Sequence, residues 1–179
     1  RSSDHLPQAM THHREPLKTV VLDPGDFYFG GGRTRISTLL GSCVSITLWH
    51  PRQRIGGMCH YMLTERKRPP DANLDGRFAS EAFEMFLQHV EKAGTRPSEY
   101  QAKLFGGANM LAGPSGKQMD IGPRNVAHGR QLLASKNITL MAEHVGGSGR
   151  RKLHFDIWSG DVWLAFPQGT DAEIRNAYG

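Results

Sequence analysis

Two apolar runs, at residues 44–49 and 55–63, carry the clearest strand pattern in the chain. Both are rich in β-branched and aromatic residues, which favour strands. The segment between them is polar and contains Pro51, so it is typical of a loop. The pattern therefore predicts a β-hairpin whose loop spans residues 50–54.

Shorter apolar runs predict further strands elsewhere. They lie at residues 17–22, 102–105, 138–143, 152–157 and 162–166. Apolar positions repeat with helical spacing over residues 78–93, and Gly94 is a natural stop for that helix. A second helix is expected from about residue 125 to 134, with Asn125 acting as a local cap.

Two segments are expected to be loops. Residues 27–32 end in three glycines, and no following Lys-Ser/Thr pair indicates a phosphate-binding loop. Residues 64–77 are charged and contain Pro69 and Pro70. This second loop directly follows the strand that carries His60, so it could form a rim above that side chain.

Strands outnumber helices in this pattern, and hairpins are frequent. We expect an α/β fold with mixed, largely antiparallel sheets and helices covering the outer faces. At 179 residues the chain fits one domain with a sizeable core. We place that domain at residues 17–179 and predict a flexible N-terminal arm at residues 1–16, which are polar and lack a sustained period.

The hairpin brings together a thiol and an imidazole. Antiparallel pairing should place Cys43 roughly opposite Tyr61 or His60. An adjacent imidazole can take the thiol proton to give a thiolate–imidazolium pair, and the thiolate can then attack an acyl carbon. This pairing predicts a cysteine nucleophile with a histidine base.

The residues before Cys43 could supply the rest of such a site. Gly41 and Ser42 are small enough for a tight turn, and the backbone N–H groups of Ser42 or Cys43 could face a developing oxyanion. Ser37 and Thr38 both carry hydroxyls that could hold the imidazole in one tautomer. The pattern alone does not choose between these two.

Several blocks around these residues resemble the CheD family of chemoreceptor glutamine deamidases. LGSCVSITLWHP is followed by GGMCHYML, in which His60 comes seventeen positions after Cys43. The blocks FGGANM (105–110), IGPRNV (121–126) and VGGSGRRKLHFDIWSGDVWL (145–164) follow in the family's order. The resemblance covers about residues 20–166.

The resemblance implies roles for particular residues. The family's nucleophile falls on Cys43 and its histidine on His60. The third member is usually a threonine six residues before the cysteine, which here is Ser37, with Thr38 as a competitor. The loop with Gly106, Gly107 and Asn109 is implied to lie near the substrate.

The resemblance also implies an activity and partners. A receptor glutamine would be converted to glutamate through a cysteine thioester, and glutamate methyl esters could be hydrolysed in the same way. The implied fold is a layered sandwich related to other cysteine deamidases, and neither a cofactor nor a metal is implied. The expected partners are chemoreceptor cytoplasmic domains and a CheC-type phosphatase. The chain departs from many members at His144, where Asp is common, and at Ser148, where Asn is common.

The composition of the chain indicates its compartment and the kind of partner it binds. Two cysteines in 179 residues are not a disulfide framework, so a reducing cytoplasm is expected. The chain shows no signal peptide and no apolar run long enough to span a membrane, so membrane insertion is not expected. The net charge of +5 comes from dispersed basic residues without a nucleic-acid motif, so we expect an acidic protein partner rather than nucleic acid.

Three alternatives remain at this point. A non-catalytic module that regulates chemoreceptors or a CheC-type phosphatase would share this fold, and the departure at Ser37 favours it. A cysteine protease would need a cleft for extended backbone. A zinc site built from Cys43, Cys59 and His60 is disfavoured because residues 59 and 60 should point to opposite faces of one strand, and Cys59 is better explained by core packing.

Overall fold

The computed structural model describes residues 15–110, 120–167 and 175–176. Its elements are β1 (Lys18–Leu22), β2 (Phe27–Gly30), β3 (Thr34–Leu40), β4 (Val44–His50), β5 (Ile55–Cys59), α2 (Ala79–Lys92), a 3-10 turn η1 (Pro97–Glu99), β6 (Gln101–Gly106), α3 (Ile121–Ser135), β7 (Thr139–Val145), β8 (Arg151–Asp156), β9 (Val162–Ala165) and β10 (Arg175–Asn176). The arm expected at residues 1–16 lies outside the described residues except for its last two positions.

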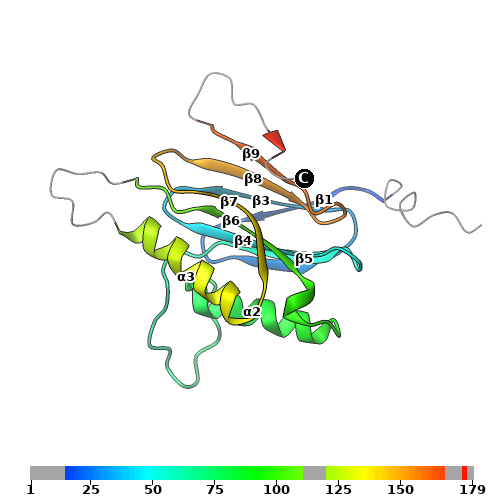
Figure 1. Ribbon diagram of the computed structural model, residues 1–179, viewed down its shortest axis with the longest axis horizontal. Helices are drawn as coiled ribbons and strands as arrows, with labels where there is room; N and C mark the ends of the chain where they lie inside the picture. The colour runs from blue at the N-terminus through cyan, green and yellow to red at the C-terminus, as the bar shows by residue number, and fades with distance from the viewer. Residues whose placement is uncertain (1–14, 111–119, 168–174, 177–179) are drawn as a thin grey trace, which may run out of the picture.

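The strands form two stacked sheets. The first sheet has the order β1-β3-β8-β9-β10 and the second has the order β2-β5-β4-β6-β7. The pairs β1–β3 and β6–β7 are parallel, and the other neighbours are antiparallel. Figure 1 shows the two sheets face to face, with α2 and α3 beyond the second sheet. The predicted α/β sandwich with mixed, largely antiparallel sheets is confirmed.

The two faces of β4 contribute to two different cores. Val44, Ile46 and Leu48 are buried in a cluster that includes Phe86 of α2. Trp49 packs instead against the cluster between the sheets, where its Nε1 donates a hydrogen bond of 2.7 Å to the carbonyl of Ile157. Strand β4 is therefore covered on both faces, and even its polar residues Ser45 and Thr47 are buried.

Both helices cover the same sheet. Helix α2 lies between β5 and β6 in the chain, and α3 lies between β6 and β7, so both connections join strands of the second sheet. Helix α3 packs against β4, β6 and β7, and α2 packs against β2. The expectation that helices cover both outer faces is therefore wrong, because no helix among the described residues lies on the outer face of the first sheet (Figure 1).

The predicted hairpin is present with a register shifted by one residue. Thr47 pairs with Met58, and the same register continues to an isolated bridge between Val44 and Tyr61. Both backbone hydrogen bonds of that bridge are 3.0 Å long. Cys43 is consequently opposite Met62 rather than Tyr61 or His60.

Three of the observed strands, β2, β3 and β10, were not expected from the sequence. Strand β2 occupies the start of the segment 27–32 that was expected to be a loop, and it pairs with β5. Strand β3 pairs with both β1 and β8 in the first sheet, and it ends directly before residues 41–43. Helix α3 also begins at Ile121, earlier than expected, so Asn125 lies inside the helix and not at its cap.

Candidate functional site

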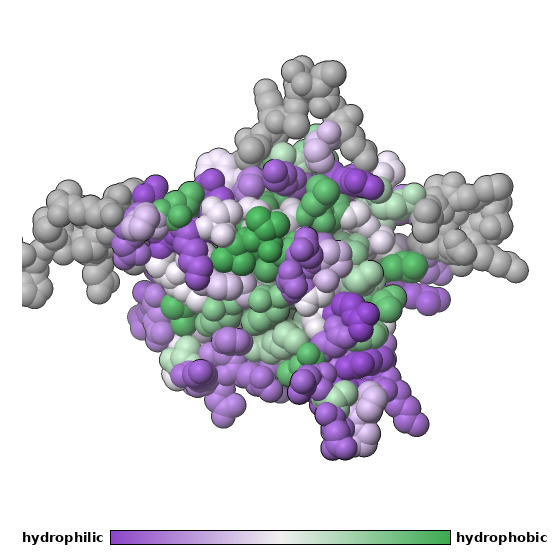
Figure 2. Space-filling model, turned by 180° about the vertical axis from the view of Figure 1, so that it is seen from behind, coloured by the Kyte–Doolittle hydropathy of each residue, from purple (hydrophilic) through white to green (hydrophobic). Residues whose placement is uncertain are grey.

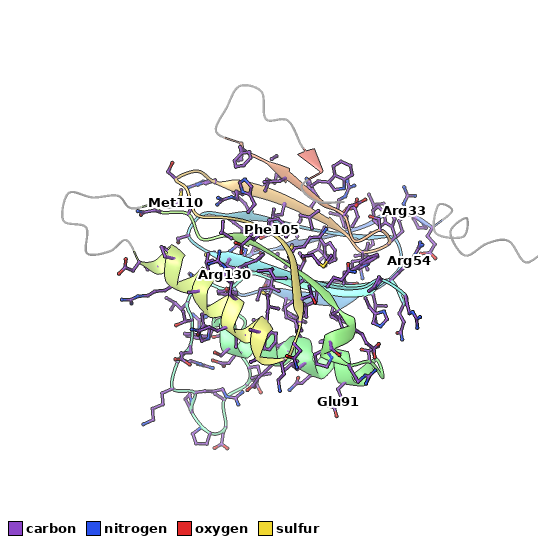
Figure 3. All side chains as sticks on the ribbon, viewed as in Figure 1. Arg33, Arg54, Glu91, Phe105, Met110 and Arg130 are labelled. Atoms are coloured by element: carbon purple, nitrogen blue, oxygen red, sulfur yellow. The ribbon has the colours of Figure 1, made fainter. Side chains whose placement is uncertain are left out.

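The chain crosses from the first sheet to the second at Gly41, Ser42 and Cys43. Strand β3 ends just before this crossing, and β4 begins just after it. Because β4 runs antiparallel to β5 and β6, the ends of those two strands lie beside its start. In Figure 3, Met110 marks this end of the sandwich, while Arg33 and Arg54 lie at the opposite end. Met110 is close to Gly41, since a Cβ on that glycine would lie 3.2 Å from Met110 Cγ.

Cys43 and His60 lie on the same face of the second sheet. Extending the register of the Val44–Tyr61 bridge makes them diagonal neighbours across the strand pair. Such neighbours are roughly 7–8 Å apart between Cα atoms, with their side chains somewhat closer. Cys43 is half-buried against the cluster between the sheets, and His60 is almost fully buried. The two side chains that the sequence paired therefore lie on the same face of the second sheet.

The hydroxyl of Thr38 holds the ring of His60. Thr38 Oγ1 lies 2.7 Å from His60 Nδ1, and it donates a 2.7 Å hydrogen bond to the carbonyl of Leu22. A hydroxyl has one proton, so Oγ1 must accept a hydrogen bond from Nδ1. The neutral ring therefore carries its proton on Nδ1, and Nε2 is left as the basic nitrogen.

Ser37 does not contact His60. Its Oγ lies 2.6 Å from Nδ1 of His154, the residue directly opposite it on β8. The expectation that Ser37 orients the ring of His60 is corrected by this geometry. Successive residues of a strand point to opposite faces, so Thr38 faces the second sheet with Ile36 while Ser37 faces outward.

Burial favours the neutral forms of both Cys43 and His60. Desolvation raises the pKa of the Cys43 thiol. Desolvation also lowers the pKa of His60, against a smaller opposing influence of the carboxylates of Asp26 and Asp23. Both shifts favour a thiol and a neutral imidazole over a preformed thiolate–imidazolium pair in the free protein.

A hollow of about 540 Å³ reaches His60 from the first sheet. Its walls include Thr38 and His60 together with the exposed apolar side chains of Val21 and Leu39 and the amine-bearing Lys152. The view from behind in Figure 2 shows apolar residues gathered near the middle of the surface among polar ones. The buried imidazole is therefore adjacent to a partly apolar depression that carries both Lys152 and Asp23.

The glycine loop after β6 lies against the nucleophile segment. Gly106 and Gly107 have φ angles of 106° and 67°, which glycine adopts without strain. A side chain on Gly106 would overlap the carbonyl of Cys43, and one on Gly107 would overlap Val126 of α3. The expected close approach is thus to the backbone of Cys43. Asn109 follows in the same loop, and its N–H donates to the carbonyl of Gly147 over 2.8 Å.

Asn125 contacts this region from α3. Its Nδ2 donates hydrogen bonds to the carbonyls of Ser42 (3.3 Å) and Met62 (2.8 Å). Its own backbone carbonyl accepts a 2.5 Å hydrogen bond from the hydroxyl of Tyr61. The side chain is 1% exposed, so sequence reasoning missed a buried contact between α3 and the candidate site.

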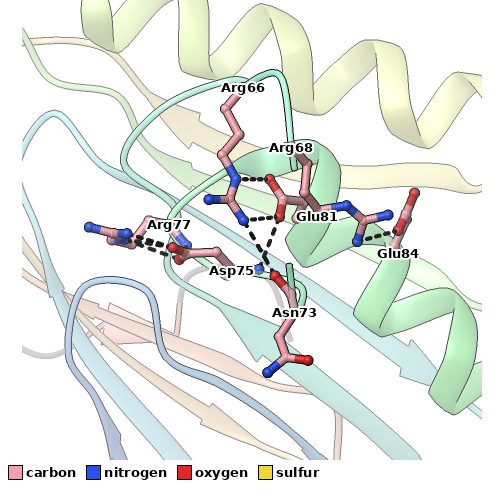
Figure 4. A network of polar contacts seen from close by, with 7 residues as sticks. All are labelled: Arg66, Arg68, Asn73, Asp75, Arg77, Glu81 and Glu84. Atoms are coloured by element: carbon pink, nitrogen blue, oxygen red, sulfur yellow. Dashed lines mark hydrogen bonds and ion pairs between the residues drawn. The ribbon is translucent and has the colours of Figure 1, made fainter. Parts of the chain in front are cut away.

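An ionic network orders the charged loop that follows His60. Glu81 of α2 accepts two hydrogen bonds from Arg66 (2.8 and 2.9 Å) and one from the backbone N–H of Asp75 (3.1 Å). Asp75 in turn pairs with Arg77 (2.6 Å), as Figure 4 shows. The carbonyl of Arg77 accepts hydrogen bonds from the N–H groups of residues 62 and 63. The loop is therefore fixed against α2 and against residues 62 and 63, and its role as a rim above His60 stays a prediction.

His144, a departure from the family pattern, has a buried partner. Its Nδ1 accepts a 2.9 Å hydrogen bond from Nε of Arg151. Arg151 is 3% exposed, and it also donates to the carbonyls of Gly106 and Gly146. Arg151 therefore holds two backbone carbonyls, one in the glycine loop and one in the turn after β7.

The second cysteine belongs to the core. Cys59 is fully buried in the cluster that contains Val44, and desolvation raises the pKa of its thiol to about 12. Cys43 packs against the other cluster, so the two sulfur atoms lie on different faces of the second sheet. Among the described residues, no group of three His, Cys, Asp or Glu side chains is arranged to hold a metal ion.

Comparison with known proteins decides the family. The model of the family described as CheD chemotactic sensory transduction matches residues 62–166. This chain belongs to the CheD family. The match covers more than half of the chain and includes the glycine loop, α3 and β6 to β9.

Named relatives cover nearly the whole chain. The probable chemoreceptor glutamine deamidase CheD 3 of Dechloromonas aromatica is 83% identical over 163 residues, which are 91% of this chain and 96% of the relative. The probable chemoreceptor glutamine deamidase CheD 1 of Chromobacterium violaceum is 41% identical, and the match covers 98% of this chain and 91% of the relative. The probable CheD of Pseudomonas syringae pv. syringae is 49% identical over 81% of this chain and 82% of its own.

The match to a solved structure is weaker than the matches to these relatives. The Bacillus licheniformis hypothetical protein YfiH aligns with 66% of this chain and 49% of its own at 12% identity. Its TM-score of 0.40 is too low to carry an argument. Within the described part of this CheD chain, no helix is both long enough and apolar enough to cross a membrane.

Proposed function

We propose that this CheD protein is a cysteine-dependent deamidase that converts glutamine side chains of chemoreceptors to glutamate. Its named relatives supply the activity and the substrate class. The observation that supports this chemistry best is the Thr38–His60 hydrogen bond, because it leaves Nε2 of His60 free to take a proton on the face that carries Cys43. No described group in the proposed route requires a cofactor.

The first half of the reaction forms a thioester. Nε2 of His60 takes the thiol proton as the sulfur of Cys43 bonds to the carboxamide carbon, and the carbonyl electrons move onto oxygen. When the oxyanion collapses, the C–N bond breaks and the imidazolium gives its proton to the departing ammonia. The products are ammonia, a neutral imidazole and an acyl-enzyme.

The second half hydrolyses the thioester. A water molecule loses a proton to Nε2 of His60 as its oxygen adds to the acyl carbon. Collapse breaks the C–S bond, and the sulfur of Cys43 recovers a proton from the imidazolium. The receptor side chain leaves as glutamate. A glutamate methyl ester would follow the same route, with methanol leaving in place of ammonia.

The neutral resting pair determines how the nucleophile is activated. Because burial raises the pKa of Cys43 and lowers that of His60, proton transfer is expected to accompany attack on the substrate. His60 therefore acts as a general base, and the free thiol should react slowly with alkylating agents near neutral pH. The backbone N–H groups at Ser42 and Cys43 are the proposed oxyanion donors, and the loop with Gly106, Gly107 and Asn109 is the proposed substrate-side wall.

The proposal also includes partners and a compartment. The hollow beside His60 is partly apolar and carries Lys152, which suits an acidic, amphipathic receptor segment. A CheC-type phosphatase that occludes the same site remains part of the proposal on the strength of the family alone. The two free cysteines suit the reducing cytoplasm, where the receptors' signalling domains are.

The non-catalytic alternative has lost its specific support. It was favoured by the departure at Ser37, which appeared to leave the imidazole without an orienting hydroxyl. The 2.7 Å contact between Thr38 Oγ1 and His60 Nδ1 supports Thr38 as the orienting hydroxyl of the proposed site. The enzyme is therefore the function that the geometry favours.

The test is ammonia release and the mass shift from glutamine to glutamate on a purified chemoreceptor cytoplasmic fragment. We expect turnover by the native chain, none by Cys43→Ala, and nearly native turnover by Cys59→Ala, because Cys59 is a core residue on the other face. Binding of the fragment by the native chain without ammonia release would overturn the deamidase proposal in favour of a regulatory module. Loss of turnover in Cys59→Ala alone would overturn the assignment of Cys43.

A further inference from the structure

Asn125 joins two chain segments that flank the candidate site. One hydrogen bond from its amide ends on the carbonyl of Ser42, directly before the nucleophile, and the other ends on the carbonyl of Met62, two residues after His60. The two accepting residues lie just before β4 and just after β5, which are neighbouring strands, and the donor lies on a helix that is distant from both in the sequence. One side chain therefore controls the relative position of the residues next to Cys43 and His60.

The environment of Asn125 makes this contact rigid. The side chain is 1% exposed, and an unbonded buried amide would be costly, so both N–H donors must keep their acceptors. The hydroxyl of Tyr61 holds the backbone of Asn125 from the second sheet. Gly129, one turn further along α3, leaves room for that hydroxyl, because a Cβ there would lie 2.5 Å from it. The helix therefore packs closely on the strands at this point.

The hydrogen bond from Asn125 to the carbonyl of Ser42 also restricts the direction of the Cys43 N–H, because both groups belong to one planar peptide bond. In a trans peptide, the carbonyl of Ser42 and the N–H of Cys43 point in opposite directions. The carbonyl of Ser42 is bonded to Asn125 of α3, so the N–H of Cys43 points away from Asn125. No described residue accepts a hydrogen bond from this N–H.

The neighbouring carbonyls are held in the same way. The carbonyl of Gly41 accepts a 3.0 Å hydrogen bond from the N–H of Ala108, and that of Cys43 accepts one of 2.9 Å from the N–H of Gly107. Asn125 supplies the bond for the middle carbonyl of the three, where no backbone donor is present among the described residues. Three successive peptide carbonyls are thus fixed by the glycine loop and α3.

We propose that Asn125 is a positioning residue that fixes the Ser42–Cys43 peptide with its N–H directed at the oxyanion of the tetrahedral intermediate. This proposal rests on the proposed deamidase function. Asn125 does not touch the substrate, and it acts through the peptide bond it holds. Preorganised N–H donors stabilise an oxyanion because they need no rearrangement as charge develops.

The test compares two variants of Asn125 with one matched control. Asn125→Asp keeps the shape of the side chain but places carboxylate oxygen against the carbonyls of Ser42 and Met62, and Asn125→Ala removes the contact. Tyr61→Phe removes the hydrogen bond to the backbone of the same residue and leaves the Ser42 carbonyl bonded. Thermal melting of all three verifies that they are folded at the assay temperature.

Three measurements separate orientation of the peptide from general loosening. They are kcat and KM for deamidation of a receptor fragment, the inhibition constant of a glutamine-peptide aldehyde, and the rate of Cys43 alkylation by iodoacetamide as a function of pH. The aldehyde forms a tetrahedral hemithioacetal whose oxygen needs the Cys43 N–H, whereas alkylation needs only the thiolate. For both Asn125 variants we expect kcat to fall about 10- to 100-fold, below the loss of about 10²- to 10³-fold caused by removing a direct oxyanion donor.

The aldehyde should bind correspondingly more weakly, while KM and the pH profile of alkylation change little. Tyr61→Phe should retain native kcat and aldehyde affinity. Native kcat in a folded Asn125 variant, or an equal loss in Tyr61→Phe, would overturn the proposal. If the native chain releases no ammonia, the deamidase function fails, and the aldehyde measurement still decides whether Asn125 positions the N–H.

Discussion

Strand β3 carries two adjacent hydroxyls, each bonded to a different histidine. Thr38 holds His60 between the sheets, and Ser37 holds His154 on the outer face. The two hydrogen bonds have similar lengths, so length does not separate them. What separates them is the face of the strand, because only the inner face carries the ring that lies beside Cys43.

Replacement of the two hydroxyls should therefore have different effects. Thr38→Val keeps the shape of the side chain but removes the acceptor for Nδ1–H of His60, so the proton can move to Nε2 and the base is lost. We expect turnover to fall about 10- to 100-fold, a part of the 10²- to 10⁴-fold that general acid–base catalysis contributes. Ser37→Ala should retain turnover within about three-fold, as measured by ammonia release.

Thr38→Ser is the conservative control for this pair of variants. It restores the hydroxyl and should recover most of the activity, although the missing methyl group leaves χ1 less restricted. The opposite result, with Ser37→Ala inactive and Thr38→Val active, would return the orienting role to Ser37.

The site residues show what a sequence can and cannot specify. Cys43 and His60 were proposed because their strand pattern and the family blocks agree, and the structure places them on one face of the second sheet. The orienting hydroxyl was misplaced because counting six residues back from Cys43 leads to Ser37, and without knowledge that β3 is a strand its faces cannot be assigned. Asn125 was interpreted as a cap because its acceptors, Ser42 and Met62, are brought to it only by tertiary packing.

At the scale of elements, the loop 64–77 depends on one carboxylate of α2. Glu81 is 6% exposed and accepts hydrogen bonds from both Arg66 and the backbone of Asp75. The side-chain hydrogen bond from Arg66 lowers the pKa of Glu81, so this contact persists at neutral and mildly acidic pH. The loop should lose its order when that carboxylate is removed.

Glu81→Gln should expose the loop to proteolysis. The neutral amide cannot accept both Arg66 bonds as a charged carboxylate does, so we expect faster trypsin cleavage after Arg66 and Lys67. Glu84→Gln is a matched control on the same helix, because Glu84 is exposed and pairs with Arg68 only at 3.8 Å. Mass spectrometry follows the cleavage in both variants. Equal cleavage rates would show that Glu81 does not order the loop.

The predicted elements differ from the observed ones where glycine or missing context obscures the pattern. The hairpin and α2 have strong periodicity, and both were predicted closely. Strand β2 was missed because the glycine run at residues 30–32 dominates its short aromatic segment. Strand β3 was missed because its polar and apolar residues do not alternate regularly and one of its stabilising partners, β8, is far away in the sequence.

At the scale of the whole molecule, burial lowers the pKa of several histidines at once. Desolvation is the largest cause for His60, His89, His144 and His154. In the unfolded chain, these side chains titrate near pH 6.5. Between that pH and their lower folded-state pKa values, the unfolded chain binds more protons than the folded one.

The free energy of unfolding should therefore be fully maintained above about pH 6.5 and should decrease as the pH falls toward 5. A shift of the urea midpoint across this range measures the effect. The lowered pKa values of Asp75, Glu81 and Glu99 act only below about pH 4.3, so the two ranges are separable.

His144→Asn tests one contribution to this pH dependence. Asparagine can keep an acceptor near Nδ1 for Arg151 but does not titrate, so the loss between pH 7 and 5 should become smaller. A urea midpoint that is independent of pH in the native protein, or an unchanged loss in His144→Asn, would contradict this account.

The arrangement of the sheets has a consequence for the timing of folding. Thr38 belongs to the first sheet and His60 to the strand end of the second, while Cys43 lies on the connection between them. A chain that has formed only one of its sheets cannot hold the imidazole in its working tautomer. A newly made molecule should therefore have no deamidase activity until its two sheets have docked. Immature chains would then leave the receptors of the cell unmodified.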